Sequence, residues 1–157
     1  MQTFQDWNSD AAAAVIASHA GEQGAMLPIL HELQETFGYI PEVAVPMVAQ
    51  ALNLSRAEVH GVVTFYHDFR QEPAGRHVLK LCQAEACQAT GCNALTARAE
   101  EKLGIKLGET SGDGRVTLEP VYCLGLCSVS PSAMIDGRIV GRLDEKKLDA
   151  LLAETSR

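Results

Sequence analysis

Two stretches of the sequence set its architecture: H-V-L-K-L-C-Q-A-E-A-C at residues 77–87 and R-V-T-L-E-P-V-Y-C-L-G-L-C at residues 115–127. Each begins with a short apolar run bounded by turn-forming residues, which is typical of a buried strand. We therefore predict strands at His77–Cys82 and Arg115–Tyr122, each with a cysteine pair at or just beyond its end. Parallel pairing of these strands would gather all four cysteines at one edge of a sheet.

The elements around these strands predict a thioredoxin-like domain. A helix over residues 93–103 connects the two strands, and its apolar face ends at Gly104. Asp136-Gly137 is a strong hairpin signal between two short strands, and Asp144 is suited to cap a last helix. The resulting order is strand, helix, strand, hairpin, helix, as in thioredoxin-like folds with a mixed sheet.

Residues 11–70 have the periodicity of helices. The first is expected at Ala11–Ala20, the second between Gly24 and Gly38, the third from Pro41, and the fourth from the capping box Ser55-Arg56-Ala57-Glu58. Their spacing predicts an inward apolar face made of Leu27, Leu30, Leu33, Phe37, Val43, Met47, Val48, Val59, Val62, Val63 and Tyr66. Phe65 and Phe69 are expected in the core with Tyr66, although part of this aromatic group could instead face a partner protein.

A linker at Gln71–Gly75 separates the two parts. We therefore predict an α+β protein with an N-terminal helical bundle at residues 1–75 and a thioredoxin-like α/β domain at residues 76–157.

Composition narrows the range of functions. The 157 residues include 13 basic and 20 acidic side chains, for a net charge of −7, which disfavours nucleic acid and anionic membranes as partners. The sequence has neither a targeting signal nor an apolar run near the roughly 20 residues of a membrane span, so we expect a cytoplasmic protein without direct membrane contact. In that reducing compartment, five cysteines are better explained as thiolate ligands or buried thiols than as a disulfide framework.

The cysteine spacing favours a 2Fe-2S cluster. Cys82 and Cys87 are separated by four residues, and Cys123 and Cys127 by three, so both sulfurs of a pair can reach one iron. Small residues at positions 84, 86, 91 and 125 would let backbone amides approach the sulfurs.

Other interpretations of the cysteines fit less well. Structural zinc sites are dominated by C-x-x-C, which is absent here, and a thiol-disulfide catalyst needs the same motif. A Rieske centre needs histidine ligands, but neither cysteine loop contains a histidine. A further interpretation is that the cysteines are inert buried thiols. It does not explain why four of the five cysteines follow the ends of predicted strands.

Cys92 complicates the choice of ligands, because Cys82, Cys87 and Cys92 are evenly spaced and any two could form the pair. Cys92 falls at or beyond the start of the predicted helix, so we favour a small buried side chain there. His60 and His67 are seven residues apart on a helix that packs inward, and we interpret them as ordinary polar residues and not as a metal pair.

A DNA-binding redox sensor is the distant alternative, since residues 45–66 could form a helix-turn-helix. Arg56 is the only lysine or arginine between Tyr39 and His67, however, whereas groove readers need several cations for phosphate contacts.

The motifs also resemble a known family. C-x4-C and C-x3-C about 35 residues apart, F-G-Y-I-P at residues 37–41 and L-S-R-A-E-V-H-G-V-V-T-F-Y-H-D-F at residues 54–69 are similar to the thioredoxin-like 2Fe-2S ferredoxins, the 24 kDa subunit family of complex I. Within it, R-H-V-L-K-L-C-Q-A-E-A-C-Q-A at residues 76–89 most resembles the gamma subunit of NAD-dependent formate dehydrogenase.

This resemblance implies one 2Fe-2S cluster on Cys82, Cys87, Cys123 and Cys127, with Cys92 outside the ligand set. It implies a partner subunit that holds FMN and NAD and a further iron-sulfur or molybdenum subunit. The corresponding chain of NADH:quinone oxidoreductase or of an NAD-reducing hydrogenase is the alternative. The sequence has no G-x-G-x-x-G, P-loop or evident acid-base set, so we expect a non-catalytic electron-transfer subunit that is inactive alone.

Overall fold

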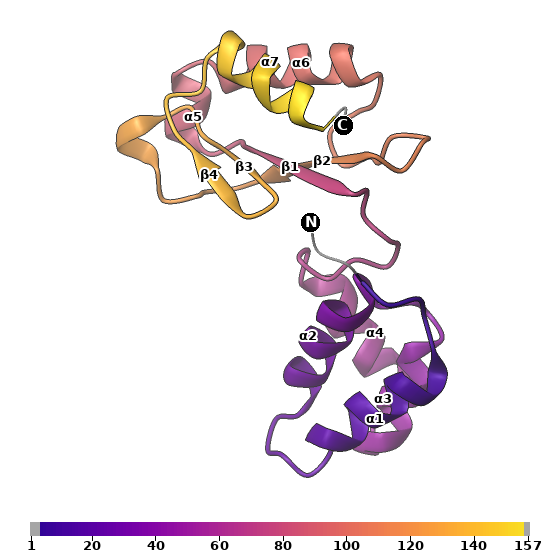
Figure 1. Ribbon diagram of the computed structural model, residues 1–157. Coiled ribbons are helices and arrows are strands. Elements are labelled where there is room, and N and C mark those ends of the chain that lie inside the picture. Colours follow the sequence, from indigo (N-terminus) through magenta and orange to yellow (C-terminus); the bar gives the residue numbers. More distant parts are fainter. Residues whose placement is uncertain (1–3, 156–157) are drawn as a thin grey trace. The chain divides into compact units, whose positions relative to one another are not determined.

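The computed structural model describes residues 4–155 (Figure 1). Contacts divide these residues into two compact units, one ending at Pro73 and the other beginning at Ala74. The domain boundary near residue 75 stays a prediction. Within the described residues, no helix is long and apolar enough to cross a membrane.

Four helices form the first unit: α1 (Ser9–His19), α2 (Met26–Phe37), α3 (Ala44–Leu52) and α4 (Arg56–Phe65). All four contribute side chains to one apolar core, which includes Ile16, Leu30, Val48 and Val59. Asn8 caps α1 by accepting from the amides of Asp10 and Ala11. This cap was not predicted from the sequence, although asparagine is among the residues that favour the position.

The capping box predicted at the start of α4 is confirmed. The Ser55 hydroxyl accepts from the Glu58 amide at 3.2 Å, and the Glu58 carboxylate accepts from the Ser55 amide at 2.8 Å. The hydrogen bond from the Ser55 amide, helped by that from its hydroxyl, lowers the pKa of Glu58. The box therefore satisfies backbone donors that the helix itself leaves free.

Some predictions for the bundle were wrong. Helix α3 begins at Ala44 and not at Pro41, because residues 41–43 precede its first turn; Val43 therefore lies outside the helix and is 56% exposed. Tyr66 is 45% exposed because its backbone turns extended directly after α4 and leaves the apolar stripe. Leu27, at the edge of the α2 stripe, and Phe65 are also exposed, whereas Phe69 is buried as expected.

The second unit contains a four-stranded mixed sheet with the order β2-β1-β3-β4. Its strands are β1 (His77–Cys82), β2 (Val116–Val121), β3 (Ala133–Ile135) and β4 (Arg138–Val140). The helices are α5 (Glu85–Ala89), α6 (Cys92–Leu103) and α7 (Glu145–Glu154), with a single 3-10 turn, η1, at Cys127–Val129. Helices α6 and α7 lie side by side over the sheet in Figure 1 and share its core.

This arrangement confirms the predicted α+β class with a mixed sheet. Asp144 caps α7 by accepting from the Lys147 amide at 2.8 Å, and Asp136-Gly137 closes the β3–β4 hairpin with both residues at positive φ. Pro120 lies in β2, an edge strand, where a missing amide donor is tolerated. Helix α5 was not predicted, and it contains Cys87, which we had expected in a loop.

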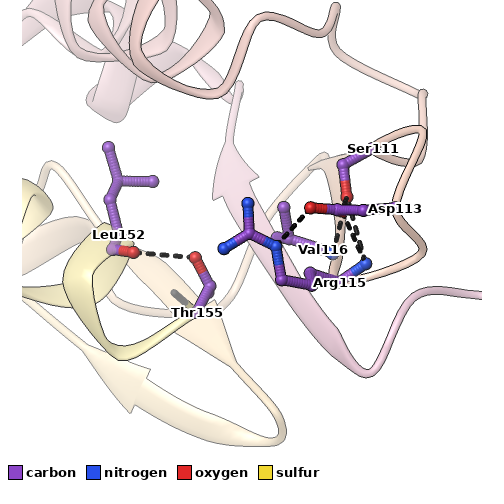
Figure 2. A network of polar contacts seen from close by, with 6 residues as sticks. All are labelled: Ser111, Asp113, Arg115, Val116, Leu152 and Thr155. Carbon is purple, nitrogen blue, oxygen red and sulfur yellow. Dashed lines mark hydrogen bonds and ion pairs between the residues drawn. The ribbon is translucent and has the colours of Figure 1, made fainter. Parts of the chain in front are cut away.

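Two local features fix where β2 begins. Figure 2 shows the turn before it, in which the Ser111 hydroxyl donates to Asp113 at 2.7 Å and accepts from the amides of Arg115 and Val116. The hydrogen bond from Ser111, together with bonds from Arg115, lowers the pKa of Asp113 to about 2. Gly75 approaches the same point closely, because a Cβ there would lie 2.8 Å from the Val116 backbone.

The capping box gives a stability prediction. Replacing Ser55 with alanine leaves the Glu58 amide without its side-chain acceptor, so Ser55→Ala should lower the free energy of unfolding by about 1 kcal/mol in chemical denaturation. The control is Ser18→Ala, which removes an exposed hydroxyl that donates to the Val15 carbonyl within α1 and should change stability by less than about 0.5 kcal/mol. Equal effects of the two substitutions would contradict the capping role.

Candidate metal centre

The parallel pairing of β1 and β2 places the cysteines. Cys82 ends β1 opposite Val121, which ends β2, and the Gln83 amide donates to the Val121 carbonyl at 2.8 Å. The chain then runs from β1 into α5, which carries Cys87, and from β2 into the segment that carries Cys123 and Cys127. The four cysteines therefore follow the same edge of the sheet, as the sequence predicts.

The thiols lie in two pairs. Cys82 and Cys87 pack in one buried cluster, and Cys123 is near enough to Cys127 to raise the pKa of that thiol. The first pair is buried and the second is exposed. The two pairs are near enough for the charge of Cys87 to act on Cys127, so the structure brings all four predicted residues into one region.

Hydrogen-bond donors surround the buried pair. Burial alone would raise the pKa of Cys82, but the amides of Ala84 and Leu124 and the side chains of Cys87 and Ser132 donate to its sulfur, and together they bring that pKa below its usual value. Donors of this kind favour the thiolate, which is the form that binds metal. Cys82 is thus prepared to act as a ligand.

The exposed pair is held differently. Cys123 has a φ of 150°, a backbone conformation that costs about 1–3 kcal/mol for a residue with a side chain and that clusters at functional sites. Gly125, at a φ of 74°, donates its amide to the Cys123 sulfur at 3.3 Å. Interaction with the neighbouring Cys123 side chain raises the pKa of Cys127.

Two of the four small residues expected to bring amides to the sulfurs do so, namely Ala84 and Gly125. The Gly91 amide donates instead to the Gln88 carbonyl at 3.1 Å, as part of the turn between α5 and α6. For Ala86 the expectation stays a prediction.

Cys92 is the first residue of α6 and is buried beside Cys82 and Cys87. Burial, with the neighbouring thiols of Cys87 and Cys82, raises its pKa, so Cys92 ionises less readily than a free cysteine. Its sulfur donates to Gln83 and Asn93 in long contacts of 3.9 and 3.7 Å. The buried side chain that the sequence predicts is observed.

Two residues near the thiols were not predicted from the sequence. Gln83 connects the β1 end to α6, because its side-chain amide donates to the Thr96 hydroxyl at 2.9 Å. Ser132 is a buried hydroxyl next to Cys87, and it follows Pro131, whose peptide bond with Ser130 is cis.

The donor set fits a 2Fe-2S cluster. Four thiols in two pairs, one after β1 and one after β2, offer two ligands to each of two irons. Within residues 4–155, no group of three or more His, Cys, Asp or Glu side chains converges as one metal ion would require. Two separate pairs suit a binuclear centre better than a zinc ion, which needs its ligands around one point.

Comparison with known proteins identifies the class. The family model of the thioredoxin-like [2Fe-2S] ferredoxins matches residues 12–156, and this chain belongs to that family. The family resemblance drawn from the cysteine motifs and the thioredoxin-like fold are thereby confirmed.

The relatives are components of larger enzymes. The chain is 39% identical over 139 residues to a subunit of the NADH-quinone oxidoreductase of Rhizobium meliloti, covering 88% of this chain and 83% of that protein. It is 36% identical over 130 residues to the corresponding NADH-quinone oxidoreductase protein of Escherichia coli K12, covering 83% and 78%. It is 30% identical over 139 residues to the NADP-reducing hydrogenase subunit HndA of Solidesulfovibrio fructosivorans, covering 88% and 81%.

A solved structure shares the fold. The crystal structure of an NAD+-reducing [NiFe]-hydrogenase in the air-oxidized state matches with a TM-score of 0.71 and 27% identity over 83% of this chain. The matched region is 22% of that hydrogenase chain, so this protein corresponds to about a fifth of it.

Proposed function

We propose that this chain is an electron-transfer subunit of an NAD-linked oxidoreductase, with one 2Fe-2S cluster held by Cys82, Cys87, Cys123 and Cys127. The observation that carries the proposal is the placement of two cysteine pairs after the ends of the parallel strands β1 and β2. Membership in a 2Fe-2S ferredoxin family supports the same cofactor. When bound, such a cluster accepts and releases one electron at a time.

The chain's own residues have defined tasks in this proposal. The Cys82–Cys87 pair lies in the protein interior, where amide and hydroxyl donors stabilise negative charge on sulfur. The exposed pair, Cys123 and Cys127, forms the side from which electrons can reach the centre without crossing the core. Cys92 is not a ligand in this assignment, because it is the first residue of α6 and the family resemblance implies ligands at the other four cysteines.

The chain depends on partner subunits. Its sequence has no nucleotide-binding motif, so FMN and NAD are assigned to a partner and the chain alone is inactive. Among the NAD-linked complexes, we propose an NAD-dependent formate dehydrogenase, in which a further subunit holds iron-sulfur and molybdenum centres. The support for this choice is the resemblance of residues 76–89 to the gamma subunit of that enzyme.

A second candidate has its own support. The relatives are NADH-quinone oxidoreductase and NADP-reducing hydrogenase subunits, at 30–39% identity. The equivalent role in NADH:quinone oxidoreductase or in an NAD-reducing hydrogenase follows if this chain keeps the assembly of those relatives. The three complexes share the cluster and differ in the electron donor.

Cysteine substitution tests the cluster. The chain purified without oxygen should contain about two iron atoms and two acid-labile sulfides. Serine at position 82, 87, 123 or 127 should reduce both contents and the visible absorption several-fold, because one iron loses a thiolate. Cys92→Ser is the matched control, a buried cysteine packed beside Cys82 and Cys87, and should keep both contents. Zinc without sulfide, or loss of the cluster in Cys92→Ser alone, would contradict the assignment.

The choice of complex is tested by the electron donor. An affinity-tagged copy of the chain, isolated from its native cells, should bring with it a flavin-containing subunit and a molybdenum-containing subunit. The isolated complex should reduce NAD with formate and not with hydrogen, and should lack quinone reduction by NADH. Hydrogen-dependent NAD reduction, or NADH-dependent quinone reduction, would assign the chain to the second candidate instead.

A further inference from the structure

The Ser132 side chain is a polar group enclosed among sulfur atoms. It is 2% exposed, and its hydroxyl oxygen lies 3.5 Å from the Cys87 sulfur. The same hydroxyl is near enough to Cys82 to lower the pKa of that thiol. No buried side-chain nitrogen or oxygen in the described residues lacks a partner, and the partner of this hydroxyl is the Cys87 sulfur.

The backbone holds this hydroxyl in place. The Ser132 carbonyl accepts from the Cys82 amide at 3.1 Å, which ties the residue directly to the end of β1. On the other side, the Pro131 carbonyl accepts from the Leu143 amide at 2.8 Å, and Ala133 begins β3 and pairs with Leu81. Ser132 therefore has little freedom to move away from the sulfurs.

A donor in this position acts differently on the two redox states. Each sulfur carries more negative charge after the centre gains an electron, and a hydrogen bond to a charged acceptor is stronger than one to a less charged acceptor. Burial strengthens the effect, because little water is present to screen it. A buried hydroxyl that donates to the Cys87 sulfur therefore favours the reduced state.

We propose that Ser132 is a positioning residue that raises the reduction potential of the centre by donating its hydroxyl hydrogen bond to the Cys87 sulfur. This inference rests on the proposed function, because it needs that sulfur to be an iron ligand. It adds a determinant of potential that neither the cysteine motifs nor the family assignment specifies. The exposed pair has a backbone amide, from Gly125, and no hydroxyl among its described contacts.

The test is a redox titration of the loaded full-length chain, followed by the electron paramagnetic resonance signal of the reduced form. Ser132→Ala should lower the ratio of reduced to oxidised centre about tenfold at a fixed potential, which for one electron equals a shift of about 59 mV to lower potential. Ser132→Thr keeps the hydroxyl and should stay close to the unsubstituted chain. Ser132→Val introduces a side chain of nearly the same shape as threonine but without the hydroxyl. It should lower the reduction potential as Ser132→Ala does.

Ser128→Ala is the control for a nearby hydroxyl, since Ser128 follows Cys127 directly and is exposed. It should leave the potential unchanged. An unchanged or raised potential in both Ser132→Ala and Ser132→Val, with two irons and two sulfides bound, would overturn the inference and leave the proposed function intact. If the unsubstituted chain binds no such cluster, the proposed function and this inference fail together. If Ser132→Ala prevents cluster binding, the inference is tested by the difference in reduction potential between Ser132→Thr and Ser132→Val.

Discussion

The parallel pairing of β1 with β2 is the constraint on which the candidate centre depends. Its register sets Cys82 opposite Val121, so the two strands end level with each other and release both cysteine segments at the same edge. A shift by one residue would turn Cys82 to the other face of the sheet and separate it from the second pair. The turn at Ser111–Arg115 and the close approach of Gly75 to Val116 hold the other end of this pairing.

The two cysteine pairs differ in exposure, so the proposed centre has a buried side and a side that faces the surface. Cys82 and Cys87 are enclosed with Cys92, Ala84 and Leu124, whereas Cys123 and Cys127 are exposed. A centre held by both pairs has one side in the protein interior, where hydrogen bonds adjust its energy, and one side at the surface, where a partner can approach. Because this sequence has no nucleotide-binding motif, the nucleotide belongs to a partner in our proposal, and the exposed side is where that partner would exchange electrons with the centre.

Much of this architecture could be predicted from the sequence because its signals are local. The strands around the cysteines, the Asp136-Gly137 hairpin, the Ser55 box and the Asp144 cap all depend on residues close together in the chain. Tyr66 and Val43 were misplaced because their exposure depends on where a helix begins or ends, which periodicity alone does not determine. Ser132 could not be assigned, since 45 residues separate it from Cys87 and only the folded sheet brings them together.

The central claim is that each cysteine pair holds one iron of a binuclear centre. A crystal structure of the loaded chain, with anomalous scattering measured at the iron absorption edge, tests it most directly. We expect two iron peaks, one between the sulfurs of Cys82 and Cys87 and one between those of Cys123 and Cys127. A single metal peak shared by all four sulfurs, or an iron bound to Cys92, would contradict the claim.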